Sequence, residues 1–192
     1  MVYRLLFPAM WLSWVIYWLW ASRRAKPNER REPVRSGTLH LIPLFLAVWL
    51  LWARRIPVAL LNDRLFPWVA WEFWIAASIT ALGLLLTVCA RVYLGPNWSG
   101  VVTIKQGHEL IDTGPYALVR HPIYTGLLVA FIGSAIALGE WRGVLAVLLA
   151  WAAFWRKLRV EERWMIERFG EQYRAYRKRV PALVPSWKWR RA

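Results

Sequence analysis

Apolar residues occur in five long runs that are separated by polar, mostly basic segments. The runs are Val2 to Ala21, Leu39 to Ala53, Phe66 to Leu94, Pro122 to Leu138 and Val144 to Trp155. A transmembrane helix needs about 20 apolar residues, which the first and third runs supply. The second run becomes long enough only if Arg54 and Arg55 snorkel and the helix continues toward Leu61. The pattern predicts an all-α integral membrane protein with about five transmembrane helices.

The fourth and fifth runs predict a helical hairpin, because only the short segment GEWRG separates the two. Pro122 suits the first turn of a helix, where no backbone N–H is needed. Gly126 and Gly133 share one face, on which small residues let another helix approach closely. The fifth run continues without a breaker into the charged C-terminal residues. We therefore expect one long helix that leaves the membrane.

The chain divides into two predicted parts. Residues 1–94 hold three transmembrane helices joined by a basic linker at 22–36. Residues 95–192 form a core made of a polar segment, a transmembrane hairpin and a cytoplasmic C-terminal helix, at 95–121, 122–156 and 157–192. The polar segment cannot span a membrane, and it is long for an idle loop in so small a protein.

Composition supports membrane insertion and excludes several other classes. The chain is 58% hydrophobic, and most of its 16 tryptophans stand near the ends of the apolar runs, as in interfacial belts. The net charge of +15 comes from basic residues in the linkers and the C-terminal region, a distribution that favours a cytoplasmic membrane face over nucleic-acid binding. Cys89, the only cysteine, excludes an intramolecular disulfide and a cysteine-based metal site.

The distribution of lysine and arginine also predicts the topology. The N-terminus lies outside, the linker at 22–36 inside and the turn at 54–64 outside. The segment at 95–120 lies inside, GEWRG outside and the C-terminus inside. The first run is long enough to span and is followed by no small-residue cleavage site, so we expect a permanent helix rather than a signal peptide. The polar segment and the charged C-terminal helix thus share the cytoplasmic side.

Polar residues that could carry chemistry converge on that side. They are His108 and Tyr116 in the polar segment, Arg120 to Tyr124 at the start of the fourth run, and Lys157, Glu161 and Glu162 after the fifth. Lys157 and Glu161 are four residues apart, so they share a helical face and either pair as a surface salt bridge or face a ligand. His108 and His121 are accompanied by no cysteine and by no pattern of carboxylates typical of a metal site, so we expect no metal. Glycine-rich nucleotide-binding loops and G-x-S-x-G hydrolase motifs are absent.

Two motifs, GHELIDTGPYALVRHPIYTG and EERWMIERFGEQYRAYRKRVPALVP, occur in this order on either side of the apolar hairpin. Together they resemble the isoprenylcysteine carboxyl methyltransferase family, which is related to the phospholipid methyltransferases. The resemblance covers roughly residues 95–185. It implies a membrane enzyme that uses S-adenosyl-L-methionine, with a helical, non-Rossmann fold.

The resemblance also implies the site residues. Cofactor-binding positions would be His108, Glu109, Leu110, Ile111, Tyr116, His121, Pro122, Ile123, Tyr124 and Glu161. Lys157 stands where eukaryotic members have an arginine associated with the substrate carboxylate, and Arg156 lies beside it. A family glutamine upstream of His108 has no counterpart here, and Thr103 and Ser99 are the nearest polar residues.

Methyl transfer to a carboxylate needs alignment and exclusion of water rather than a general base, since a carboxylate is already ionised at pH 7. Arg120 would then neutralise an anion of the cofactor or the acceptor, and Glu161 would hold the cofactor. If the acceptor were an amine, Glu162 is the candidate base. The partners expected are a lipophilic small molecule or lipidated substrate and the bilayer, with no nucleic acid.

Two other interpretations stay open on the sequence. One is an NADPH-dependent membrane reductase of the sterol-reductase type, which has a related RHP region. That group typically has Asn at the position of Ile123 and Trp at the position of Tyr173. The other is a non-catalytic membrane protein that binds lipid, in which the polar positions would be lost, whereas here His108, Arg120 and Glu161 are present.

Overall fold

The structure is a computed structural model that describes residues 2–23, 26–67, 69–99, 103–105 and 109–185. Five long helices dominate this part of the chain. They are α1 (Val2–Ser22), α2 (Val34–Trp52), α3 (Ala70–Leu94), α4 (Pro122–Leu138) and α5 (Trp141–Phe169). The smaller elements are α6 (Glu171–Arg179), the 3-10 turns η1 (Ala59–Asn62), η2 (Gly95–Asn97) and η3 (Gly114–Ala117), and the strands β1 (Asn28–Arg31) and β2 (Thr103–Lys105).

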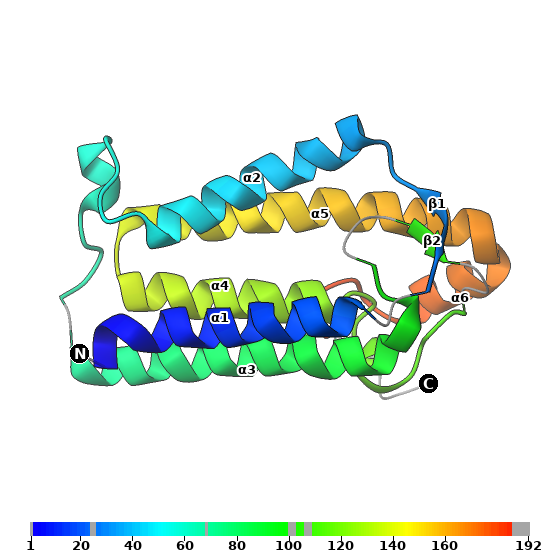
Figure 1. Ribbon diagram of the computed structural model, residues 1–192, viewed down its shortest axis with the longest axis horizontal. Coiled ribbons are helices and arrows are strands. Elements are labelled where there is room, and N and C mark those ends of the chain that lie inside the picture. The colour runs from blue at the N-terminus through cyan, green and yellow to red at the C-terminus, as the bar shows by residue number, and fades with distance from the viewer. Residues whose placement is uncertain (1, 24–25, 68, 100–102, 106–108, 186–192) are drawn as a thin grey trace.

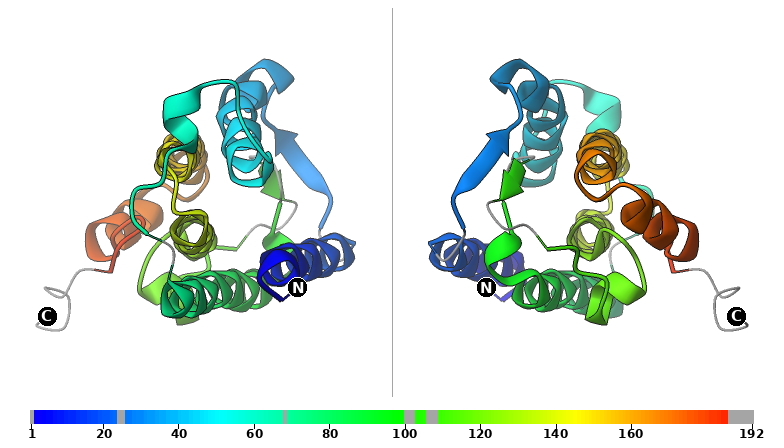
Figure 2. Two further views of the ribbon diagram at one scale, coloured as in Figure 1. Left: turned by 90° about the vertical axis from the view of Figure 1, so that its left-hand side faces the viewer. Right: turned by 90° about the vertical axis from the view of Figure 1, so that its right-hand side faces the viewer.

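The five long helices lie side by side along the long axis of the molecule (Figure 1). Helix α2 packs along α5, while α1, α3 and α4 form the opposite side of the bundle (Figures 1 and 2). Strands β1 and β2 form an antiparallel pair, which lies with α6 at the end of the bundle opposite the N-terminus. The all-α prediction is confirmed, and this small ribbon is an addition that the sequence pattern did not predict.

Helices α3 and α4 are in close contact because glycines face each other across their interface. A Cβ atom built on Gly126 would lie 2.6 Å from the Gly83 carbonyl oxygen, and one on Gly83 would lie 2.5 Å from the Ala130 backbone nitrogen. The predicted close approach at Gly126 is therefore confirmed. Small residues let two backbones meet in the membrane, where dispersion rather than the hydrophobic effect holds helices together.

Tryptophans of α1 connect this helix to α3 and α4. The Trp14 indole N–H donates to the Thr87 hydroxyl oxygen at 2.6 Å. The Trp11 indole N–H donates to the Ser134 hydroxyl oxygen at 3.1 Å, and the Trp11 ring packs edge-on against Phe131. Both indole N–H groups thus find partners on neighbouring helices of the bundle.

Three boundaries differ from prediction. Helix α2 gains its length by starting at Val34, inside the predicted linker, and it ends at Trp52 instead of continuing toward Leu61. The single C-terminal helix at 157–192 is also wrong, because Gly170 adopts φ 53°, a conformation that breaks the helix. The chain then turns into α6, and the described residues that follow Val180 are not helical.

Three helices are long and apolar enough to cross a membrane, judged by length and composition over the described residues, with windows at Leu5–Ser22, Arg35–Trp52 and Ala70–Asn97. Helix α4 is apolar but shorter, with 17 residues. The protein is an integral membrane protein. The count of five spans, like the division of the chain at residue 94, stays a prediction.

Candidate functional site

A cavity of about 250 Å³ lies near the end of the bundle that carries α6. It has a polar side, built mainly by η3, the start of α4, the second half of α5 and α6, and an apolar side between helices. Its lining residues are Trp14, Trp18, Leu44, Leu94, Asn97, Trp98, Ser99, Thr103, Glu109, Leu110, Ile111, Tyr116, Arg120, His121, Pro122, Ile123, Tyr124, Leu127, Phe154, Lys157, Glu161, Trp164, Met165, Tyr173 and Tyr176.

Most of the site residues expected from the sequence meet in this cavity. Glu109 to Ile111, Tyr116, the segment from Arg120 to Tyr124, Lys157 and Glu161 all line it, as do the polar residues Ser99 and Thr103. His108 lies outside the described residues. Glu162 and Arg156 are described but are not among the lining residues.

The start of α4 is held by the C-terminal segment of the chain. The backbone N–H groups of Arg120 and His121 donate to the carbonyl oxygens of Pro181 and Ala182 at 2.8 and 3.0 Å. The Thr125 hydroxyl donates to the Leu183 carbonyl oxygen at 2.7 Å. Segment 181–183 thus fixes the two residues that precede α4, a helix whose start lacks a side-chain cap.

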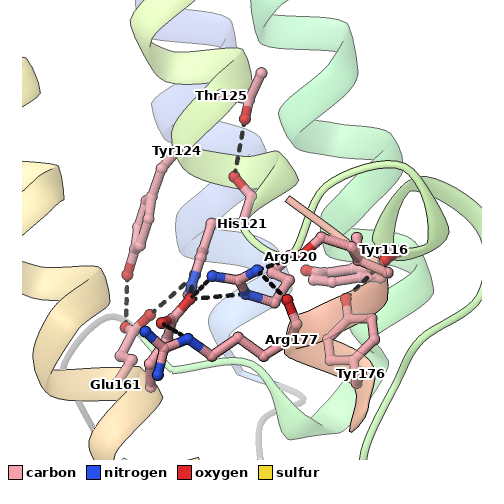
Figure 3. Close-up of polar contacts among 10 residues, drawn as sticks. Tyr116, Arg120, His121, Tyr124, Thr125, Glu161, Tyr176 and Arg177 are labelled. Carbon is pink, nitrogen blue, oxygen red and sulfur yellow. Dashed lines mark hydrogen bonds and ion pairs between the residues drawn. The ribbon is translucent and has the colours of Figure 1, made fainter. Parts of the chain in front are cut away.

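Glu162 is the buried anion to which the cations around α4 and α6 bind. Its Oε1 accepts from Arg120 Nη2 at 2.5 Å and Nε at 2.8 Å, and it lies 3.3 Å from His121 Nε2. Its Oε2 lies 3.3 Å from Arg177 Nε. Arg120 also donates to the carbonyl oxygens of Arg177 and Val180 (Figure 3).

The electrostatics of Glu162 follow from these contacts. Burial would raise the pKa of its carboxyl, but the hydrogen bonds and charges of His121 and Arg120 outweigh burial and lower the pKa to about 2. A carboxylate with so low a pKa, placed outside the cavity lining, is a poor general base. The structure therefore gives the predicted base role of Glu162 no support and makes it an anchor for Arg120.

Glu161, the next residue along the chain, faces the cavity. Its Oε1 accepts a 2.5 Å hydrogen bond from the Tyr124 hydroxyl, and its Oε2 lies 3.6 Å from His121 Nδ1 (Figure 3). The His121 and Tyr124 rings stack at 5.5 Å and an interplanar angle of 8°, and Tyr124 stacks on Phe154 at 5.2 Å and 9°. A carboxylate beside stacked aromatic rings favours a small cationic ligand.

Lys157 and Arg156 are adjacent in α5, but their side chains point in different directions. Lys157 lines the cavity, and its Nζ lies 5.4 Å from the centroid of the Tyr124 ring. Arg156 points to α2 and the preceding linker, where it lies 3.1 Å from both His40 Nδ1 and Ser36 Oγ and 3.9 Å from Glu32 Oε1. The predicted substrate role is therefore geometrically open to Lys157 but not to Arg156.

Sequence reasoning missed the tyrosines that α6 adds to the cavity. Tyr173 and Tyr176 are each 2% exposed, and the Tyr176 hydroxyl donates to the Tyr116 carbonyl oxygen at 2.6 Å. Burial raises the pKa of all three tyrosine hydroxyls, so these groups are neutral at physiological pH. Tyr173 and Tyr176 are three residues apart, and this spacing indicates that both lie on one face of a helix.

The cavity also takes Trp14, Trp18 and Leu44 from α1 and α2. Nothing in the local sequence marks these three residues, since apolar side chains of a transmembrane helix face lipid and protein alike. Their place depends on how the helices pack. The cavity therefore joins a site with charged groups to an apolar region within the membrane-spanning part of the bundle.

This chain is similar to known proteins in sequence and in fold. The family model described as "Phospholipid methyltransferase" matches residues 71–172. The protein-S-isoprenylcysteine O-methyltransferase of Schizosaccharomyces pombe is 34% identical over 113 residues, which are 57% of this chain and 48% of that protein. Protein-S-isoprenylcysteine O-methyltransferase B of Arabidopsis thaliana is 29% identical over 126 residues, 62% of this chain and 64% of that protein. The chain thus matches less than two thirds of either relative's length.

A solved structure is also similar. It is that of the eukaryotic intramembrane Ras methyltransferase, an isoprenylcysteine carboxyl methyltransferase, with a TM-score of 0.58 and 24% identity. The match covers 79% of this chain and 51% of the solved one. This likeness supports the helical, non-Rossmann membrane fold.

Proposed function

Since the chain belongs to the phospholipid methyltransferase family, we propose that it is a membrane methyltransferase that uses S-adenosyl-L-methionine. The acceptor is a lipophilic molecule with a carboxylate, of the isoprenylcysteine type. This makes the protein a carboxyl O-methyltransferase. The proposal draws on the resemblance of its motifs and on the names of its relatives.

One observation carries the proposal: a single cavity joins the carboxylate of Glu161 to the apolar side chains of Leu44, Leu127 and Phe154. A water-soluble donor and a lipid-soluble acceptor need such a place to meet. A polar pocket alone would serve a soluble substrate, and an apolar pocket alone would serve a lipid. The combination fits a transfer between the two phases.

The residues on the polar side fit the cofactor. When bound, S-adenosyl-L-methionine supplies a methyl group on a positively charged sulfonium. Glu161, whose side chain is 24% exposed, provides a carboxylate for the cofactor's amino or ribose groups, and the stacked rings of His121 and Tyr124 offer π faces to its positive charge. Glu109, Leu110, Ile111 and Tyr116 also line the cavity, and His108 is proposed as a further contact on the resemblance alone.

Lys157 is the residue that we assign to the acceptor carboxylate. It lines the cavity beside Tyr124, whereas Arg120, although it also lines the cavity, is bound by Glu162 and by two backbone carbonyl groups. Lysine supplies a point charge without the bidentate geometry of arginine. Since the carboxylate is ionised at pH 7, the residues need only align it and exclude water.

The cavity end of the bundle is proposed to face the cytoplasm. Strand β1 of the basic linker and helix α6 lie at that end of the molecule (Figure 1), and both are rich in lysine or arginine by sequence, as expected for cytoplasmic segments. The N-terminus of α1 then lies outside and α6 inside. In this orientation the cofactor arrives from the cytosol and the acceptor from the inner leaflet.

Calorimetry on the purified protein in detergent tests the proposal. We expect S-adenosylhomocysteine, the product of methyl donation, to bind and NADPH not to bind. Binding of NADPH alone would favour the reductase of the sterol-reductase type, and binding of neither would favour a non-catalytic lipid-binding protein. His121→Ala should abolish binding of S-adenosyl-L-methionine, whose sulfonium charge the ring faces, while the protein still folds. Unchanged affinity in this variant would show that the site lies elsewhere.

A further inference from the structure

A second cavity, of about 200 Å³, lies at the end of the bundle opposite α6. It is bordered by α1 and α2, which lie on opposite sides of the bundle (Figures 1 and 2). Its lining includes Phe7 of α1, Leu51 and Trp52 of α2, Phe73 of α3 and Ala137 of α4. The two cavities share no lining residue, so the second is a separate space.

The lining of the second cavity leaves no polar group for water to satisfy at its one hydroxyl, that of Ser134. This hydroxyl donates to the Ala130 carbonyl oxygen at 2.9 Å and accepts from the Trp11 indole N–H at 3.1 Å. An apolar cavity of about 150 Å³ stays dry and binds small apolar molecules. The second cavity therefore favours hydrocarbon over water, and in a bilayer that hydrocarbon is the chain of a lipid.

Two exposed arginines, Arg54 and Arg55, stand beside this cavity in the sequence. They follow the lining residue Trp52 by two and three positions. Because α2 ends at Trp52, both lie in the turn that follows the helix. No hydrogen bond or ion pair joins either side chain to the part of the chain that the structure describes. Both guanidinium groups are therefore available to an anion.

The backbone on either side of the two arginines is anchored by other residues. Arg142, which is 4% exposed, donates to the carbonyl oxygens of Leu50, at 3.2 Å, and Ala53. After the arginines, the Asn62 side chain accepts from the Ile56 N–H at 3.1 Å and donates to the Ile56 carbonyl oxygen at 2.9 Å. The end of α2 thus does not need the two arginines as caps, and their position in the chain is set.

We propose that the second cavity and the two arginines form a binding site for an anionic phospholipid. One acyl chain occupies the cavity, and Arg54 and Arg55 bind the phosphate of the headgroup. Guanidinium groups suit this role, since their fork of N–H donors matches phosphate oxygens. This lipid is not the methyl acceptor, because its site lies at the other end of the bundle. The inference therefore goes beyond the proposed function.

Native mass spectrometry of the full chain in detergent tests the inference. The probes are dioleoyl phosphatidylglycerol and dioleoyl phosphatidylcholine, which have the same acyl chains and differ in net charge. We expect the first molecule of phosphatidylglycerol to bind about tenfold more tightly. The double variant Arg54→Gln/Arg55→Gln should bring the ratio of the two affinities close to one. Glycerol 3-phosphate, which has the phosphate but no acyl chain, should bind far more weakly than phosphatidylglycerol.

Two further variants separate the cavity from the charge. Ala137→Phe fills the cavity, so it should weaken binding of both lipids and leave their ratio unchanged. The matched control is Arg174→Gln/Lys178→Gln, because both residues are exposed on α6 at the opposite end of the bundle. It removes the same two charges and should keep the wild-type ratio. Melting temperatures without added lipid show which variants are folded.

Several outcomes would overturn the inference. They are a wild-type ratio near one, an unchanged ratio in Arg54→Gln/Arg55→Gln, and an equal fall of the ratio in the α6 variant. Glycerol 3-phosphate that binds as tightly as phosphatidylglycerol would show a site for phosphate alone. Unchanged lipid affinities in a folded Ala137→Phe would place the acyl chain elsewhere, and if this variant does not fold, the two double variants decide. Binding of S-adenosylhomocysteine tests the proposed function separately.

Discussion

Glu161 and Glu162 are adjacent in sequence but have opposite surroundings in the folded protein. The Glu161 side chain is 24% exposed, lines the cavity and accepts a hydrogen bond from Tyr124. The Glu162 side chain is 5% exposed and binds the guanidinium groups of Arg120 and Arg177. Successive residues of a helix point about 100° apart, so one carboxylate can serve a ligand while its neighbour supports the fold.

The two glutamates should therefore respond differently to the same substitution. Glu161→Gln is expected to weaken binding of S-adenosylhomocysteine about tenfold or more, because it removes the charge at the cavity, with little effect on melting temperature. Glu162→Gln is expected to lower stability by about 3 kcal/mol, because it leaves buried cations without their partner. Calorimetry and thermal unfolding in detergent measure the two effects. A loss of stability in Glu161→Gln together with a loss of affinity in Glu162→Gln would contradict the geometry.

Stability should depend on acid pH through Glu162. Its folded-state pKa of about 2 lies below the ordinary value of 4.5, so the ionised form stabilises the protein. This contribution is complete above about pH 4.5 and is lost as the pH falls toward 2. The difference in melting temperature between the wild-type protein and Glu162→Gln should shrink as the pH is lowered from 5 to 2.5. A constant difference across this range would argue against an ionised Glu162.

The hydroxyl of Tyr124 is expected to hold Glu161 in position. Tyr124→Phe removes the 2.5 Å hydrogen bond to the carboxylate but keeps the stacked ring, so the affinity for S-adenosylhomocysteine should fall about tenfold. Tyr93→Phe is the control, because Tyr93 is 51% exposed and does not line the cavity. Equal affinities in the two variants would show that the Tyr124 hydroxyl does not position the ligand.

Lys157 and Arg156 offer a second pair of neighbours with different expected roles. Lys157→Ala should raise the KM for a carboxylate acceptor about tenfold and leave the affinity for S-adenosylhomocysteine unchanged, because it removes the charge at the cavity. Arg156→Ala should leave that KM unchanged and lower the melting temperature, because its contacts with His40, Ser36 and Glu32 join α5 to α2 and its linker. Methyl transfer to S-farnesylcysteine measures the KM of both variants. A raised KM in Arg156→Ala with an unchanged KM in Lys157→Ala would contradict the assignment of the acceptor carboxylate to Lys157.

One added methyl group at the interface of α3 and α4 should lower the stability of the protein. Gly126→Ala places a Cβ atom 2.6 Å from a backbone oxygen of α3, and such overpacking costs about 1–3 kcal/mol. Gly37→Ala in α2 meets nothing within 4 Å, so the better helix propensity of alanine should leave stability equal or slightly higher. Thermal unfolding in detergent compares the two. Equal melting temperatures would show that the two helices are less closely packed than described.

Local sequence determined much of this protein. The apolar runs predicted the α1, α3, α4 and α5 segments, because hydrophobic length is a local property. Pro122 predicted the start of α4. The two motifs predicted a relationship to the isoprenylcysteine carboxyl methyltransferases and the phospholipid methyltransferases, and the match over residues 71–172 confirms the phospholipid methyltransferase family. The motifs also predicted most residues that line the polar side of the cavity.

Tertiary structure alone decided which of those residues face the ligand. Helical spacing gives the angle between Glu161 and Glu162 but not which of them points at the cavity, since that depends on where α4 and α6 pack. Gly170 was visible in the sequence, yet the fold-back of α6 onto Tyr116 depends on contacts 60 residues apart. The hydrogen bond from Trp14 to Thr87 likewise joins residues that are 73 positions apart. Periodicity describes the faces of one helix, and only packing decides what each face meets.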